Sequence, residues 1–312
     1  MGVPRNDDAA VKWYQKAADQ GLPEAQNDLG IMCRQGRGVE KDPAKALEWY
    51  RKAARQGYAP ALFNIGTAYY NGDGVRIDDS AAYAWFSLAK MKGSKVASEA
   101  VQRAITELSP GKQGDGKLYL ADLLAAGKEV PQDMAAAMVV LEDLVRSGSA
   151  SATMRLAKIY MNGWGVPKDP AKAAQYCNDA AKKKFPPAMV CLGYLNASGM
   201  LGDNRDKEAF DWYEKAARTG SPIALYSLGT MYAQGKGTKQ DLEQAYICLS
   251  AAVEARLGVA LPLFQSLAER LGPERIKKIA NKVRSQRDRY YAHILDTIDL
   301  EFGYVIKVDK LD

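Results

Sequence analysis

The chain has 312 residues, of which 47% are hydrophobic and 26% are charged, so it can bury one or two ordinary cores, which argues against a disordered chain. The formal net charge is +6, but the 43 basic and 37 acidic residues are interspersed, which favours solvated helix faces over a surface dedicated to acidic partners. No apolar run approaches the roughly 20 residues that cross a bilayer, and the first residues lack the apolar core of a secretory signal.

The four cysteines, with the single histidine His293, predict neither a metal site nor a cofactor, because they contain no C-x-x-C pair. Cys33, Cys177 and Cys248 fall in columns of buried residues, where a thiol acts as a small hydrophobic group. Cys177 and Cys191 could lie at similar heights across a helical hairpin, but we do not expect a disulfide between them from sequence alone.

The chain begins in the middle of a repeat. Residues 1–21 contain only the turn and second helix of a longer unit, and residues 22–93 contain two full units, which start 36 residues apart at Leu22 and Tyr58. In the second unit, Asn-Gly-Asp-Gly separates two segments whose apolar residues recur at helical spacing. Each unit therefore predicts a helical hairpin, and we expect the small residue Gly66 to let its two helices approach closely.

The period breaks after the second unit. Residues 94–112 predict one further helix, ended by Ser-Pro-Gly, that forms a joint, and residues 113–256 predict four more units, the first of them degenerate. Residues 257–312 predict capping helices and a tail, as the last repeat requires a cover for its apolar face. Aspartates such as Asp42 and Asp78 stand at expected helix starts, where capping explains them without acid–base chemistry.

The residues ALFNIG, YYNGDGV and DDSAAYAWFSLA, repeated with variation along the chain, are similar to Sel-1-like repeats, which are relatives of tetratricopeptide repeats. This resemblance implies an all-α, right-handed superhelical solenoid of antiparallel helix pairs. It also implies a non-enzymatic scaffold or adaptor for protein–protein interaction, since bacterial relatives act in signalling, envelope assembly and host contact. Some relatives carry a cysteine pair in each repeat, a pattern that this chain lacks.

The variable positions on the first helix of each unit lie off the expected core stripe, and the resemblance puts them on the concave face. Aromatic, Met and Arg side chains are common there, and these types dominate interface energetics. We therefore expect a protein or peptide segment to bind these positions. They are Asn27, Asp28, Ile31 and Arg34 in the first full unit, Phe63, Asn64, Thr67 and Tyr70 in the second, Leu118, Tyr119 and Asp122 in the degenerate unit, and Met154, Arg155, Lys158, Met161, Tyr194 and Tyr226 beyond it.

Two alternatives to a protein scaffold stay open. The first is a cell-envelope-associated saccharide-binding module or hydrolase, although no nucleophile, base or phosphate-loop motif supports catalysis. The second is binding of nucleic acid, or of an acidic protein, through the basic segment Arg270–Arg289. We expect a soluble chain that is cytoplasmic, or periplasmic or secreted if a signal precedes it.

Overall fold

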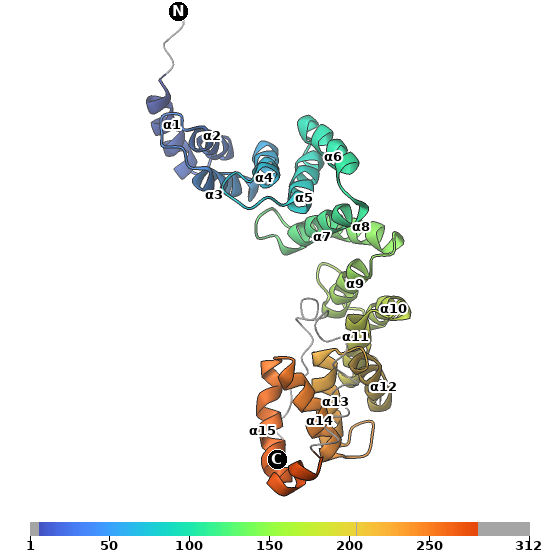
Figure 1. Ribbon diagram of the computed structural model, residues 1–312. Coiled ribbons are helices and arrows are strands. Elements are labelled where there is room, and N and C mark those ends of the chain that lie inside the picture. The colour runs from blue at the N-terminus through green and yellow to red at the C-terminus, as the bar shows by residue number, and fades with distance from the viewer. Residues whose placement is uncertain (1–5, 204, 280–312) are drawn as a thin grey trace, which may run out of the picture. The chain divides into compact units, whose positions relative to one another are not determined.

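The computed structural model describes residues 6–203 and 205–279, and these ranges are helical without any strand. Figure 1 shows the helices following one another as hairpins joined by short turns. The chain divides into two compact units, Met1–Ala152 and Thr153–Asp312. The predicted class, an all-α solenoid of helix pairs, is confirmed, and no helix in the described ranges is long and apolar enough to span a membrane.

The first unit consists of α1 (Asp7–Asp19), α2 (Pro23–Gln35), α3 (Pro43–Ala54), α4 (Ala59–Asn71), α5 (Asp79–Met91), α6 (Lys95–Glu107), α7 (Pro110–Ala126) and α8 (Met134–Arg146). The helices of the second unit are α9 (Ala150–Asn162), whose first turn crosses the boundary, α10 (Pro170–Lys182), α11 (Pro186–Ala197), α12 (Asp206–Ala217), α13 (Pro222–Gln234), α14 (Leu242–Glu254), the short η1 (Gly258–Ala260) and α15 (Leu261–Leu271). Residues 273–279 are also helical.

Local capping explains why the hairpins begin and end at these residues. The side chains of Asp42 and Asp78 each accept a hydrogen bond of 2.9 Å from the backbone N–H three residues on, so the interpretation of these aspartates as caps is confirmed. The first helices α2 and α4 end at Gly36 and Gly72, whose positive φ angles of 70° and 78° close the last turn.

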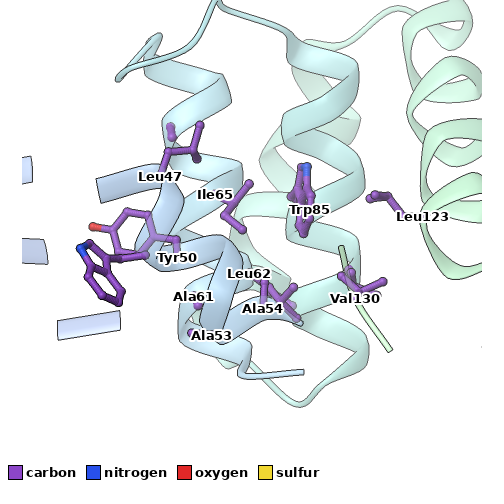
Figure 2. Close-up of a cluster of buried hydrophobic side chains, with 14 of the residues drawn as sticks. Leu47, Tyr50, Ala53, Ala54, Ala61, Leu62, Ile65, Trp85, Leu123 and Val130 are labelled. Atoms are coloured by element: carbon purple, nitrogen blue, oxygen red, sulfur yellow. The ribbon is translucent and has the colours of Figure 1, made fainter. Parts of the chain in front are cut away.

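The core of the first unit runs between the paired helices, as Figure 2 shows for the side chains around Tyr50, Ile65 and Trp85. Trp85 and Ile65 are completely buried, and Leu123 of α7 and Val130 belong to the same apolar cluster. Burial of such side chains contributes about 1.5–3 kcal/mol each, so this cluster is a main source of the stability of the first unit.

The predicted joint forms α6, which begins after the capping Ser94 and packs along α5. The following helix starts earlier than expected, because Ser109 caps a new helix at Pro110 and does not merely end the joint. This α7 packs against both α5 and α8, and it therefore takes the place of the first helix of the next unit.

One prediction about the cysteines is wrong, because Cys177 of α10 and Cys191 of α11 form a disulfide. Their Cα atoms are 6.3 Å apart and both side chains are completely buried in the contact between the two helices. Cys33 and Cys248 are free and buried, as expected. Burial raises the pKa of the Cys33 thiol and raises the pKa of Cys248 to about 12, so neither thiol is activated.

At the C-terminal end, α15 packs against α14, and Arg275 in the helical turn that follows forms an ion pair of 3.1 Å with Glu243. The basic segment Arg270–Arg289 is described only as far as residue 279, so its remaining part and the predicted tail lie outside the described residues. The prediction of an acidic partner there stays a prediction.

Candidate functional site

A pocket of about 640 Å³ lies among α4, α5 and α6 of the first unit. One wall is the face of α4 that carries Phe63, Thr67 and Tyr70, three of the residues selected from the sequence. They follow one another at helical spacing, so they project from one side of α4. Tyr70 is 47% exposed, and the ring of Phe63 lies 5.3 Å from the ring of Phe86, measured between centroids.

The floor of the pocket is α5, where Ala82, Tyr83 and Phe86 form a buried apolar cluster with Val101 of α6. The opposite wall is α6, which contributes the small residues Ala100 and Ala104 to the lining. Sequence reasoning treated this segment only as a joint and named none of its residues as part of a site. Its apolar residues recur at helical spacing, and this amphipathic pattern was the signal that could have indicated a second wall.

Charged groups lie at one end of the pocket, where α4 ends and α5 begins. Asp79 of α5 forms an ion pair of 2.7 Å with Lys112, and this hydrogen bond raises the pKa of the lysine ammonium. Arg103 and Glu107 of α6 also line the pocket, and both are exposed to solvent. The pocket is therefore apolar and aromatic at its floor and charged at one end.

The polar face of α2 makes contacts within the chain. Asn64 of α4 donates a side-chain hydrogen bond of 2.8 Å to Oδ1 of Asn27, which is only 4% exposed. The Nδ2 group of Asn27 in turn donates a long hydrogen bond of 3.4 Å to Oδ1 of Asp28. The guanidinium of Arg34 forms an ion pair with the carboxylate of Asp73 at an N–O distance of 3.8 Å. The interpretation of Asn27 as an exposed groove residue is wrong, because its amide is needed to join two neighbouring first helices.

Four further residues selected from the sequence, Ile31 of α2 and Leu118, Tyr119 and Asp122 of α7, differ in their exposure to solvent. Leu118, Tyr119 and Ile31 are half-buried, whereas Asp122 is exposed and interacts within the chain. Burial, with smaller contributions from the neighbouring Tyr69 and Glu129, raises the pKa of Tyr119 to about 12. The structure does not place these residues in the pocket lining.

In the second unit, Met154, Met161 and Tyr226 are buried, with exposed fractions of 6%, 5% and 3%. The expectation that they lie on an open face is therefore wrong. The whole stretch from residue 222 to residue 231 of α13 is buried, which suits its apolar composition, since a helix that is apolar on all sides is a buried helix. Arg155, Lys158 and Tyr194 are half-buried and each interacts within the chain.

The described part of the chain offers few side-chain groups for metal binding or catalysis. Within residues 6–203 and 205–279, no group of three His, Cys, Asp or Glu side chains could hold a metal ion. The carboxylate of Asp79 is already paired with a lysine, and the remaining lining is mainly aromatic and aliphatic. Such an arrangement can bury apolar groups of a ligand.

The fold and this pocket define an α-helical repeat protein with a recess between helices. A family model, the Sel1 repeat, matches residues 1–22, 23–58, 59–94, 150–185, 186–221 and 222–256, and the chain belongs to this family. The matched residues include the predicted half-repeat. They do not include 95–149 or 257–312, so α6 and the degenerate unit, like the C-terminal segment, lie outside the matched repeats.

Several solved structures are similar to the chain. A Sel1 repeat protein from Oxalobacter formigenes is 28% identical, with a TM-score of 0.46, over 78% of this chain and 99% of that one. A protective antigen present in uropathogenic Escherichia coli strains, described as displaying an SLR fold, is 25% identical over 100% and 86%, with a TM-score of 0.31. A sel1 repeat protein from Klebsiella pneumoniae is 22% identical over 83% and 99%, with a TM-score of 0.26. No curated protein matches the chain.

Proposed function

We propose that the protein is a non-enzymatic scaffold that binds a segment of a protein partner. The binding surface is the face of α4 that lines the pocket, in the compact unit Met1–Ala152. The observation that carries this proposal is the position of Phe63, Thr67 and Tyr70 in the wall of the α4–α5–α6 pocket. The repeat pattern predicts that these residues lie off the core stripe of α4; in the structure Phe63 also packs on Phe86, whereas Tyr70 is exposed. Proteins of the Sel1 repeat family are typically protein–protein interaction scaffolds, which supports the same function.

The energetics of recognition favour this face. A tyrosine such as Tyr70, which is 47% exposed beside an apolar recess, contributes a large contact area at a small cost in side-chain entropy. The pocket volume of about 640 Å³ lies within the range of roughly 300–1,000 Å³ that suits burial of ligand groups. An apolar floor with few unpaired polar groups also gives little support for acid–base catalysis.

The proposal is tested by affinity purification from the native organism, with the full chain as bait and Tyr70→Ala as the variant. Loss of a hot-spot tyrosine is expected to reduce recovery of the partner at least about tenfold. Trp164→Ala is the matched control, because Trp164 is an aromatic residue of the second unit that is 53% exposed and lies outside the pocket lining. Circular dichroism verifies that both variants fold. Unchanged recovery with Tyr70→Ala would contradict the proposal.

A further inference from the structure

The α4–α5–α6 pocket has the geometry of a helix bundle that lacks one helix. Each of the three helices contributes to the pocket lining a pair of residues that are four or seven positions apart, so the two residues of each pair lie on the same side of their helix. These pairs are Phe63 and Tyr70 on α4, Ala82 and Phe86 on α5, and Ala100 and Ala104 on α6. In helical bundles, side chains at such spacings on facing helices surround a further helix.

The walls of the pocket carry small side chains at the positions that a further helix would approach, above a floor that Phe63 of α4 and the alanines of α6 already partly cover. Both α4 and α6 pack along α5, as the ribbon in Figure 1 shows. Side chains of all three helices line the pocket. Helices that pack together have axes about 8–10 Å apart, and the closest approaches need small side chains at the contact. Ala82 in the floor and Ala100 and Ala104 in the wall supply such small side chains.

The polar groups of the lining favour a helix over an extended peptide. An extended segment exposes its backbone N–H and C=O groups, which need partners when they are buried. The Thr67 hydroxyl already donates to the carbonyl of Phe63 at 3.0 Å, and the Asp79 carboxylate is paired with Lys112. A helix satisfies its own backbone hydrogen bonds, so an apolar surface of this kind can bury one without loss.

The charges on the α6 wall specify the orientation of the incoming helix. Arg103 and Glu107 lie one turn apart on α6 and are exposed, and no ion pair joins either of them to a described residue. A partner with an acidic and a basic side chain one turn apart would face both charges in one direction and repel both in the other. Complementary charges beside an apolar seam select partner and direction in this way.

We propose that the pocket binds an amphipathic α-helix of a protein partner, which inserts its apolar stripe between α4 and α6 and pairs its charges with Arg103 and Glu107. This inference rests on the proposed function, because it names the class of partner for the same face. It assigns a role to α6, which lies outside the matched repeats.

A displayed library of helical peptides tests this inference, with the full chain as bait. The library has a fixed apolar stripe and random residues at the flanking positions, and a second library carries a proline in the central turn. Binders are expected only from the first library, with an acidic and a basic residue one turn apart. Ala104→Phe, which narrows the pocket, is expected to weaken these binders at least about tenfold.

The double variant Arg103→Glu/Glu107→Arg is the sharpest control, because both residues are exposed and their exchange keeps the helix and its net charge. It is expected to select peptides with the charges in reverse order. Failure to enrich any helical peptide, equal enrichment of the proline library, or unchanged charge order with the double variant would each overturn the inference. Recovery of the native partner that depends on Tyr70 would in that case leave the scaffold function standing.

Discussion

Gly66 of α4 faces the ring of Phe86 of α5 so closely that a β-carbon at residue 66 would lie 2.6 Å from Cδ1 of that ring. The expectation that a small residue here permits close packing is confirmed. The same relationship recurs between Gly30 and Tyr50 and between Gly193 and Tyr213. It is therefore a repeated contact of the hairpins, and at Gly66 it also fixes the floor of the pocket.

The substitution Gly66→Ala is expected to destabilise the protein by about 1–3 kcal/mol, because the added methyl group overpacks the contact with Phe86. Gly114→Ala is the control, since Gly114 lies in α7 with no atom within 4 Å of the added carbon. It should stabilise the protein by about 0.5–1 kcal/mol through its better helix propensity. Urea denaturation measures both changes, and equal effects at the two positions would contradict the packing argument.

The Cys177–Cys191 disulfide is expected to stabilise the second unit. It closes a loop with a sequence separation of 14, for which the chain-entropy model gives about 3 kcal/mol. A reductant should therefore lower the thermal midpoint of the natural chain and leave that of the Cys177→Ala/Cys191→Ala variant unchanged. Thiol labelling of the denatured, unreduced chain should modify Cys33 and Cys248 only, and labelling of all four cysteines would contradict the disulfide.

Buried tyrosines are expected to make the protein sensitive to alkaline pH. Burial raises the pKa of Tyr50 to about 12, outweighing the nearby Arg34 guanidinium, and also raises the pKa of Tyr119 to about 12. The folded chain thus holds these protons more tightly than the unfolded chain, whose tyrosines titrate near 10. The stabilisation is complete below about pH 10 and is lost as the pH rises toward about 12.

Urea denaturation across this interval measures the loss, together with the ultraviolet absorbance of tyrosinate. Tyr50→Phe should flatten the pH dependence and keep the stability at neutral pH, since the Tyr50 hydroxyl is buried without a well-formed hydrogen bond. An unchanged slope in this variant would show that Tyr50 does not contribute.

The hydrogen bond between Asn64 and Asn27 is expected to couple the first two full repeats. Asn64→Ala leaves the buried Oδ1 of Asn27 without this donor, which should cost about 1–3 kcal/mol. A double-mutant cycle with Asn27→Ala should give a coupling energy of at least about 0.5 kcal/mol. Asn178→Ala, at an exposed position of α10, should change stability by less than about 0.5 kcal/mol. A coupling energy of zero would show that the two amides act independently.

The repeat pattern and the composition were enough to predict the helical hairpins, because the positions of apolar and small residues depend on helix periodicity within a short segment. Asp78 as a cap and Gly66 as a contact followed from this local chemistry. The choice of Phe63, Thr67 and Tyr70 as binding residues also came from the repeat pattern and stays a prediction, and Phe63 in addition packs on Phe86. These features require only that each segment be helical and bury one side.

Other features depend on which helices meet, and only the tertiary structure decided them. The disulfide needs Cys177 of α10 and Cys191 of α11 to face each other across the contact of two helices from adjacent repeats, a distance that their separation in sequence does not determine. Asn27 is buried where Asn64 of the neighbouring helix α4 meets it, and Met154 is buried as well, although the pattern of a single helix leaves both positions open. The pocket exists because α6, a helix outside the repeat, packs beside α5 and gives the α4 residues an opposing wall.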